Sequence, residues 1–321
     1  MIPINVQNYI DSLPDNVLKI NLSEYYLTEL PDLSRFTQLQ ELYCYNNQLT
    51  SLPSNLPNSL QKLNCSYNKL TSLPNTLPNS LQELYCYINQ LISLPDHLPD
   101  FLQTLDCNRN KLTSLPNNLP NSLQTLCCYT NQLTSLPDTL PDSLQTLDCQ
   151  YNQLTTLPNT LPNSLQILYC HRNQLTSLPD TLPDSLQTLN CQYNKLTSLS
   201  DNLCFPHGPN SLQTLDCQYN KLTTLPDLPN SLQTLKCYCT SELKKVYPLF
   251  ATFKTISEQI KYIQTQNWQL TKKKVEKRMK LLNPKEVGLV ATAIKWKMKP
   301  ERMIWYLEQG YKLDDIYDLT E

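Results

Sequence analysis

The sequence predicts a repeat solenoid of the α/β class, in which short coils each add one strand to a parallel sheet, followed by a small helical segment. Three observations support this prediction. A stretch of about 21 residues, Leu60–Ser80, returns almost unchanged along most of the chain. Each copy contains a short strand pattern, an asparagine and two prolines in constant phase. The composition then changes at about Ser241, where asparagine and proline become rarer and tryptophan appears.

Each repeat unit opens on a leucine or valine that recurs at nearly constant spacing. Within a unit the pattern is L-x-x-L-x-C-x-x-N-x-L-x-x-L-P-x-x-L-P-[ND]-S. Repetition at a fixed period of this length is typical of solenoid proteins and is considered before secondary structure. The units start at Val17, Leu39, Leu60, Leu81, Leu102, Leu123, Leu144, Leu165, Leu186, Leu212 and, truncated, Leu232.

The second leucine and the cysteine of each unit predict a short strand, because alternate side chains of a strand point to opposite faces. Both residues then face inward. A free cysteine packs as a small hydrophobe, so we expect a core column and neither disulfides nor a zinc site, whose paired spacing is missing. Cys127, Cys204 and Cys239 lie outside this column. The column comprises Cys44, Cys65, Cys86, Cys107, Cys128, Cys149, Cys170, Cys191, Cys217 and Cys237.

An asparagine follows three residues after the cysteine, where the chain leaves the strand. A buried carboxamide donates and accepts at once, so it can satisfy backbone groups of its own coil and of the next. The sequence therefore predicts an asparagine ladder made of Asn47, Asn68, Asn89, Asn110, Asn131, Asn152, Asn173, Asn194 and Asn220.

The rest of each unit, the return arm, carries two prolines four residues apart. Proline fixes φ and lacks a backbone donor. We therefore expect extended structure or single turns on this convex side, with an Asn-Ser or Asp-Ser turn leading into the next strand.

On these residues, the units resemble the short-period leucine-rich repeats of bacterial effector proteins, and the cysteine-bearing, LPNSL-linked form resembles leucine-rich repeat proteins of giant DNA viruses of amoebae. The resemblance covers Val17 to Cys239 and implies a horseshoe with a strand-lined concave face and a protein-interaction role. Tyr25 departs from the pattern, since it replaces the asparagine. Some effectors with such repeats carry a ubiquitin-ligase domain with a nucleophilic cysteine, which is disfavoured here because no cysteine follows Cys239.

The outward strand positions vary from unit to unit, so we expect binding to occur there. Tyrosine offers a large amphipathic contact area and is enriched at protein interfaces. The alternative interpretation is that these tyrosines only cover the sheet and pair across strands. The residues predicted to bind a protein partner are Tyr43, Tyr45, Tyr85, Tyr87, Asp106, Tyr129, Asp148, Tyr169, His171 and Asp216.

Three segments are predicted: an N-terminal cap over residues 1–16 with a short amphipathic helix, the solenoid over 17–240 and a helical cap or accessory domain over 241–321. Residues 1–240 contain 10 basic and 18 acidic residues, a net charge of −8, which disfavours nucleic acid as the ligand of the solenoid. Residues 241–321 contain 16 basic and 10 acidic residues, a net charge of +6.

The C-terminal segment predicts a helix over Thr255–Gln266 and another that starts at Thr271 and stops at Asn283. Its basic helix either belongs to a cap or recruits a second partner, such as an acidic protein, nucleic acid or a membrane surface. No catalytic motif or cofactor-binding loop occurs, so we expect a non-enzymatic scaffold without a cofactor. We expect neither a membrane span nor a signal peptide, hence an intracellular, cytoplasmic location, in a host cell if the chain is viral.

Overall fold

The structure is a computed structural model that describes residues 3–199, 203, 211–237, 241–246 and 256–279. The chain divides into two compact units, Met1–Lys245 and Val246–Glu321. The first unit contains a helix, α1, and the described strands. Helix α2, Ser241–Val246, spans the boundary, and α3, Ile256–Met279, lies in the second unit.

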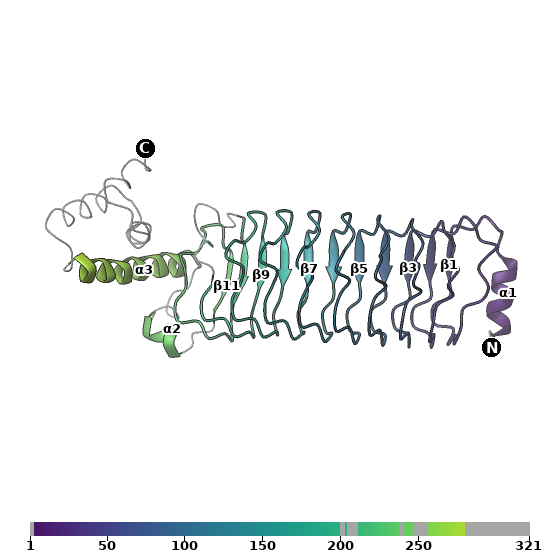
Figure 1. Ribbon diagram of the computed structural model, residues 1–321, viewed down its shortest axis with the longest axis horizontal. Coiled ribbons are helices and arrows are strands. Elements are labelled where there is room, and N and C mark those ends of the chain that lie inside the picture. Colours follow the sequence, from purple (N-terminus) through teal and green to yellow (C-terminus); the bar gives the residue numbers. More distant parts are fainter. Residues whose placement is uncertain (1–2, 200–202, 204–210, 238–240, 247–255, 280–321) are drawn as a thin grey trace, which may run out of the picture. The chain divides into compact units, whose positions relative to one another are not determined.

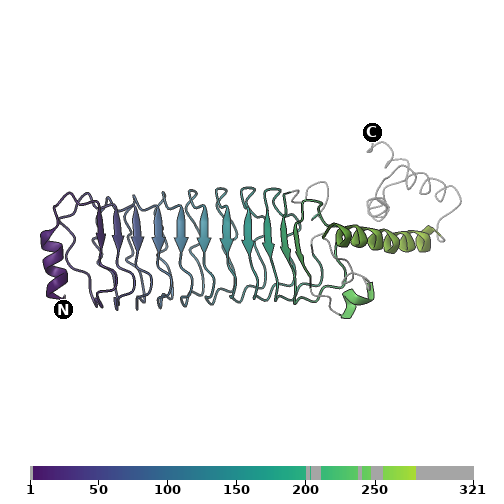
Figure 2. The same ribbon diagram turned by 180° about the vertical axis from the view of Figure 1, so that it is seen from behind.

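One parallel sheet of eleven strands runs through the first unit in the order β1 to β11, without a crossover (Figure 1). The same row of strands is seen from behind in Figure 2. Equivalent residues pair from coil to coil, as Leu63 pairs with Leu84. This confirms the predicted parallel solenoid. The strands are Lys19–Asn21 (β1), Glu41–Tyr43 (β2), Lys62–Asn64 (β3), Glu83–Tyr85 (β4), Thr104–Asp106 (β5), Thr125–Cys127 (β6), Thr146–Asp148 (β7), Ile167–Tyr169 (β8), Thr188–Asn190 (β9), Thr214–Asp216 (β10) and Thr234–Lys236 (β11).

Leucine and cysteine fill the interior of the coils. Leu63 and Cys65 both have 0% exposed surface, and the equivalent residues of other coils are buried in the same way. Burial raises the pKa of the Cys65 thiol to about 12, and the buried thiols are free. Cys237 differs from the prediction, because it is only half-buried. It follows β11, the last strand of the described sheet, so no further described strand covers it.

The asparagine of each coil joins that coil to the preceding one. In one example, Asn68 Oδ1 accepts from Leu49 N at 2.9 Å, and its Nδ2 donates to Cys44 O at 2.9 Å and to Cys65 O at 3.1 Å. The other eight asparagines of the ladder bond in the same way. The sequence predicts that each asparagine bonds to its own coil and to the next one. In the structure it bonds to its own coil and to the preceding one, because the carboxamide reaches back over the end of the preceding strand.

A column of serines also links the coils, although the sequence predicts only a local turn there. Ser80 Oγ lies 2.6 Å from Asn58 O and 2.7 Å from Leu60 O, so its hydroxyl donates to the preceding coil. Phe101 occupies this position in one coil and is 65% exposed. The contacts repeat at Ser122, Ser143, Ser164 and Ser185.

Helix α1, Ile4–Ser12, lies at the end of the sheet formed by β1 (Figure 1). Its apolar spacing matches the amphipathic pattern of the sequence, since Val6 and Ile10 are buried with 0% and 2% exposed surface. The first coil would otherwise present an apolar edge to water, as terminal coils of solenoids do.

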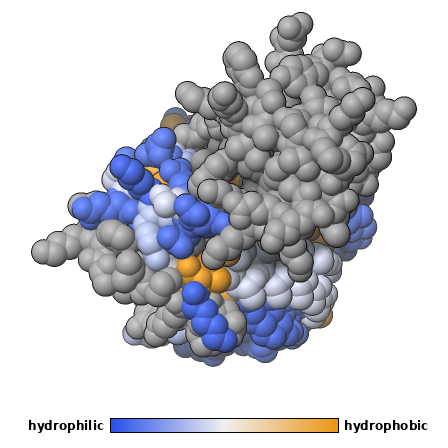
Figure 3. Space-filling model, turned by 90° about the vertical axis from the view of Figure 1, so that its left-hand side faces the viewer, coloured by the Kyte–Doolittle hydropathy of each residue, from blue (hydrophilic) through white to orange (hydrophobic). Residues whose placement is uncertain are grey.

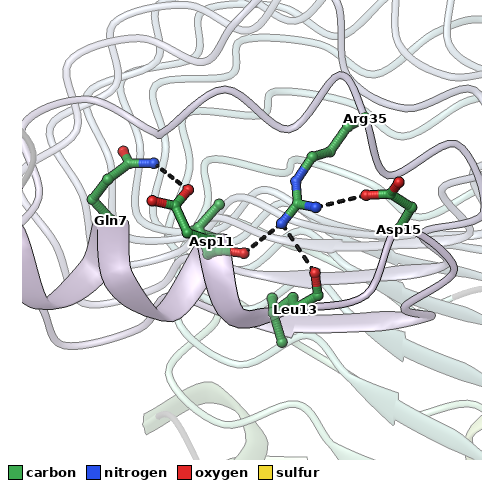
Figure 4. Close-up of polar contacts among 6 residues, drawn as sticks. Gln7, Asp11, Leu13, Asp15 and Arg35 are labelled. Carbon is green, nitrogen blue, oxygen red and sulfur yellow. Dashed lines mark hydrogen bonds and ion pairs between the residues drawn. The ribbon is translucent and has the colours of Figure 1, made fainter.

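Arg35 connects the end of α1 to the coils (Figure 4). Its Nη1 donates to Asp15 Oδ1 at 2.6 Å, and its Nη2 donates to Ile10 O at 2.6 Å and to Leu13 O at 3.0 Å. The last carbonyls of a helix lack intrahelical donors. The guanidinium of Arg35 supplies such donors and fixes the chain as it leaves the helix.

In the second unit, α3 is a continuous helix of 24 residues. The predicted break between Gln266 and Thr271 is wrong, because the four residues between them include neither proline nor glycine. Ile260 and Ile263, on the predicted apolar face, are buried. The predicted helix stop at Asn283 lies outside the described residues. The coil that starts at Leu186 is lengthened by an insertion at about residues 200–209, and most of this insertion also lies outside them.

None of the described helices combines the length and the apolar character of a membrane span. Figure 3 views the structure from the left-hand side of Figure 1. The described atoms seen there are mainly hydrophilic, and the hydrophobic ones lie in a small central group and in a few separate spots.

Candidate functional site

The outward side chains of the strands form a surface that we call the sheet face. In each coil it comprises the first and third strand residues and the residue two positions later, while the residues between them point inward. All ten residues predicted to bind a partner occupy these positions. Tyr43, Tyr45, Tyr85, Tyr87, Asp106, Tyr129, Tyr169 and His171 are half-buried, whereas Asp148 and Asp216 are buried.

The sheet face of β1 to β4, which we call the paired section, carries charges that alternate in sign and pair across strands. Lys19 Nζ lies 3.1 Å from Glu41 Oε2, and Lys62 Nζ lies 2.6 Å from Glu83 Oε2. These pairs follow directly from the register, which places each lysine opposite the glutamate of the next strand. The paired section therefore balances its own charge.

Two tyrosines complete these ion pairs. Tyr43 Oη donates to Glu41 Oε2 at 2.9 Å, and Tyr85 Oη donates to Glu83 Oε2 at 2.8 Å. The paired lysines lie over the two rings, at 4.7 and 5.2 Å from the ring centroids. Hydrogen bonds from Tyr43 and from the paired lysine lower the pKa of Glu41. Burial raises the pKa of Tyr85 to about 12. Both tyrosines thus have an internal role, as the alternative interpretation of the sequence holds.

The sheet face of β5 to β7, which we call the open section, carries carboxylates that have no basic partner among the described residues. Asp106, Cys127 and Asp148 occupy equivalent positions on adjacent strands. Asp106 Oδ1 accepts from both the backbone and side-chain amides of Asn108. Asp148 accepts from Gln150 N at 3.3 Å and from Gln150 Nε2 at 2.9 Å. In the part of the chain that the structure describes, neither carboxylate forms an ion pair.

Burial changes the chemistry of the open section. It raises the pKa of Asp106 and of Asp148, and the hydrogen bonds from the neighbouring amides only partly oppose this. Burial and the two nearby carboxylates also raise the pKa of Cys127 to about 12. This thiol is therefore protonated at neutral pH and is not an activated nucleophile. Asn108 is only 3% exposed, and its Oδ1 is buried without a hydrogen-bond partner.

The burial of two predicted contact residues was not apparent from the sequence. Asp148 is 8% exposed and Asp216 is 6% exposed, although both side chains start on the sheet face. Asp216 lies 3.9 Å from Lys236 Nζ. Gln150 accounts for part of the burial of Asp148, because it folds back onto the carboxylate. A partner would reach Asp148 by displacing this amide.

His171 lies on β8's part of the sheet face and is not arranged for acid–base chemistry. Burial, together with the charge of Arg172, lowers its pKa, so the imidazole is neutral at neutral pH. Its ring packs edge-on against Tyr151 at 5.6 Å between centroids. Among the described residues, no three His, Cys, Asp or Glu side chains are grouped so that they could hold a metal ion.

A further column, which we call the rim column, directly follows the sheet face and was not predicted from the sequence. It consists of the residue before each ladder asparagine, and each of these has a positive φ of 51–54°. A sequence signal existed, since six of its nine members are tyrosine or arginine. The members are Asn46, Tyr67, Ile88, Arg109, Thr130, Tyr151, Arg172, Tyr193 and Tyr219.

The return arms form a groove of about 840 Å³. It is lined by the same leucine, proline and threonine positions of successive coils, with His97 at one end. Since most of these positions are common to all coils, the groove carries little chemistry specific to one coil. We therefore take the sheet face as the candidate site.

Such a stack of three-residue strands, leucine core and asparagine ladder defines a repeat solenoid whose variable surface is its sheet face. Four segments of the chain, residues 38–58, 59–79, 143–163 and 211–235, match the family model described as Leucine Rich Repeat. The coils of this chain are leucine-rich repeats.

Solved structures of similar fold include bacterial proteins. YopM from Yersinia enterocolitica WA-314 is 32% identical, with a TM-score of 0.50 over 71% of this chain and 56% of that one. The functional domain of InlJ from Listeria monocytogenes, which includes a cysteine ladder, is 28% identical, with a TM-score of 0.61 over 71% of this chain and 54% of that one. The chain thus spans little more than half of either relative.

One further similarity shows the fold alone. A chain of the Toll–Spatzle complex of Drosophila is 24% identical, with a TM-score of 0.55 over 65% of this chain and 34% of that one. No curated protein sequence matches the chain.

Proposed function

We propose that the chain is a non-enzymatic protein-binding scaffold whose partner docks on the sheet face, centred on the open section. The observation that carries this proposal is the pair of carboxylates, Asp106 and Asp148, which form no ion pair within the described part of the chain while burial raises their pKa. A basic side chain from a partner would stabilise both carboxylates in their charged form. In the paired section, lysines of the chain itself already do so.

The surroundings of the open section suit a protein partner. Tyr87 lies on the coil next to the open section, Tyr129 lies within the open section, and both are half-buried. Aromatic residues are enriched at protein interfaces, where a few of them supply much of the binding energy. The Tyr85 hydroxyl donates a hydrogen bond to Glu83. Among the described residues, neither Tyr87 nor Tyr129 donates such a bond to a glutamate.

The spacing of the carboxylates restricts the partner. Asp106 and Asp148 lie two strands apart, which corresponds to ~10 Å across a parallel sheet. Basic residues at positions i and i+7 of a helix are about 10.5 Å apart along its axis. A helix laid across the strands could therefore present one cation to each carboxylate.

The proposal includes a cellular setting. Many unpaired buried thiols favour a reducing compartment, so we place the scaffold inside a cell. The resemblance of the repeats to those of effector and viral proteins makes a host-cell protein the proposed class of partner.

The test uses the full chain as bait for affinity capture from an extract, with quantitative identification of the captured proteins. The variant is the double change Asp106→Asn and Asp148→Asn, which keeps size and polarity. The matched control is Glu83→Gln, in the paired section. We expect the double variant to lose at least about tenfold of a captured protein, which corresponds to about 1.4 kcal/mol, while the control retains it. Equal capture by both variants and the parent would overturn the proposal.

Two further variants test the contribution of the tyrosine rings to binding separately from that of the carboxylates. Tyr87→Ala with Tyr129→Ala should also weaken capture, whereas Tyr26→Ala should not, because Tyr26 is 79% exposed and lies outside the sheet face. Thermal unfolding of each variant checks that the loss is not caused by unfolding.

A further inference from the structure

Four consecutive members of the rim column stack on one another, and we call them the Tyr–Arg stack. The Arg172 guanidinium lies 5.0 Å from the Tyr151 ring centroid on one side and 4.3 Å from the Tyr193 centroid on the other. Tyr193 in turn stacks on Tyr219, with centroids 4.1 Å apart and planes at 10°. These residues come from four successive coils and form a continuous row beside the sheet face.

The backbone at these positions is unfavourable for the side chains it carries. All four residues have φ between 51° and 53°. Large side chains avoid this left-handed region, whereas asparagine and glycine enter it readily. Asn46 occupies the same position in an earlier coil. A bulky residue at such a position suggests that its side chain has a use, since strain of this kind accumulates at functional sites.

Hydrogen bonds between coils hold the stack in place. Tyr151 N donates to His171 O at 3.0 Å, Arg172 N to Gln192 O at 3.0 Å, and Tyr193 N to Gln218 O at 2.9 Å. The rings and the guanidinium therefore project from a fixed backbone. A surface that is already ordered loses little entropy when a partner binds.

The outer edge of the stack is exposed and basic. Tyr151, Tyr193 and Tyr219 are 46%, 36% and 47% exposed, and Arg172 is exposed too. Exposed lysines, Lys195 and Lys221, lie two residues after the two stacked tyrosines. In the ranges that the structure describes, none of these three cations forms an ion pair.

We propose that the Tyr–Arg stack is a second binding surface, which takes an acidic peptide segment of a partner. The two rings cover the faces of the Arg172 guanidinium, so its N–H groups remain available at the edge. An arginine edge binds a carboxylate through two parallel hydrogen bonds. Lys195 and Lys221 hold further carboxylates, and the exposed ring edges contact apolar side chains between them.

The geometry favours a peptide over a nucleic acid. Single-stranded nucleic acids bind by stacking bases on free aromatic faces. Here Arg172 covers one face each of Tyr151 and Tyr193, and Tyr219 covers the other face of Tyr193. The stack uses residues other than those of the proposed sheet-face site, so either surface can fail without the other.

The experiment selects peptides from a random display library on the immobilised full chain. We expect the selected peptides to be rich in Asp and Glu interspersed with apolar residues. Their affinity should fall at least about tenfold for Arg172→Lys, which keeps the charge but lacks the paired N–H edge. It should fall similarly for Tyr193→Asn. The matched control is Tyr67→Asn, at the same backbone position outside the stack.

A stability measurement separates binding from folding. Because asparagine tolerates a positive φ, Tyr193→Asn should unfold at the same temperature as the parent chain or at a higher one, while it loses the peptide. The proposal is overturned if no peptide is enriched, if the enriched peptides lack acidic residues, or if they bind Arg172→Lys as well as the parent. Arg172-dependent binding of a random single-stranded oligonucleotide in place of a peptide would also overturn it.

Discussion

The paired and open sections belong to one sheet and have the same backbone arrangement, yet the pKa values of their carboxylates shift in opposite directions. In the paired section, hydrogen bonds from Tyr43 and then Lys19 lower the pKa of Glu41. In the open section, burial raises the pKa of Asp148, and only amides of Gln150 bond to the carboxylate. Strand length and pairing register are the same in both. The difference shows that the coil fixes where a side chain lies, whereas the neighbouring residues determine whether its charge already has a partner within the chain.

This comparison also explains why the tyrosines of the sheet face are not equivalent. The Tyr85 hydroxyl donates to the ion pair of Lys62 and Glu83. Tyr129 instead lies near Arg109 and near Asp106 and Asp148, which form no ion pair with the described residues. Composition alone would rank these residues together. We therefore expect fewer of these tyrosines to contact a partner than the row of tyrosines in the sequence indicates.

The largest expected effect tests the backbone that both sections share. Asn131 Oδ1 accepts from Leu112 N at 2.9 Å, and its Nδ2 donates to Cys107 O and Cys128 O at 3.1 Å each. Asn131→Ala leaves Leu112 N without this acceptor. It also removes one of the two asparagine donors of each carbonyl, since Asn110 donates to Cys107 O and Asn152 donates to Cys128 O as well. The change should lower the free energy of unfolding by about 1–3 kcal/mol. Asn68→Ala, in the paired section, should have the same effect. Denaturant unfolding measures both, with the exposed Gln132→Ala as the control.

An unchanged unfolding curve for Asn131→Ala would show that the ladder does not support the open section. A large difference in the free energy of unfolding between Asn131→Ala and Asn68→Ala would mean that the ladder does not stabilise the two sections equally.

The next effect concerns the open section alone. The folded pKa of Asp148 lies above its ordinary value of 3.8, so the folded chain binds this proton more readily than the unfolded chain. The contribution of Asp148 to the free energy of unfolding therefore falls as pH rises from the unfolded pKa through the folded one, and it remains low at pH 7. Asp148→Asn removes the buried charge and should raise the free energy of unfolding at pH 7 by on the order of 1 kcal/mol.

Unfolding measured at pH 7 and again near pH 4 checks the sign, because the advantage of Asp148→Asn should shrink at the lower pH. A variant less stable than the parent at pH 7 would contradict the description of the open section.

The smallest effect has the opposite sign and belongs to the paired section. The pKa of Glu83 is lowered: burial acts to raise it, but hydrogen bonds from Lys62 and Tyr85 outweigh this. Its contribution to stability is present above the unfolded pKa and is lost as pH falls through the folded one. Glu83→Gln should lower the free energy of unfolding by about 0.5 kcal/mol, the size typical of partly exposed ion pairs.

Salt provides the control for this variant. Added salt screens exposed charges, so the difference between Glu83→Gln and the parent should diminish at high ionic strength. If acid-to-amide changes in both sections shifted stability in the same direction, the comparison between them would fail.

Much of the fold was predictable because the repeat dictates it. A 21-residue unit with leucine, cysteine and asparagine in constant phase leaves one way to bury the leucines, and the structure has Leu63 and Cys65 inside. The α3 helix was divided in error because Thr271 resembles a helix start, although nothing before it interrupts the helix. A residue that favours a helix start does not by itself end the preceding helix when no proline or glycine interrupts it.

The chemistry of the candidate site was less predictable, because it depends on neighbours in other coils. Sequence spacing shows that Asp148 starts on the outward side, but its burial depends on how Gln150 folds back. The rim column was missed because its backbone leaves the strand, so the alternation of a strand does not apply to it. Its backbone N–H groups donate to carbonyls of the next coil, as Tyr151 N does to His171 O, and no single unit contains such a contact.

The lengthened coil has one further consequence. Thr188 of β9 pairs with Thr214 of β10 although 26 residues separate them, so the extra residues leave the register intact. Genetic duplication or loss of a whole unit would preserve the strand register, the leucine core and the asparagine ladder in the same way. Selection can therefore lengthen or shorten the contact surface one coil at a time, and each copy can then acquire new outward residues while the inward ones stay the same.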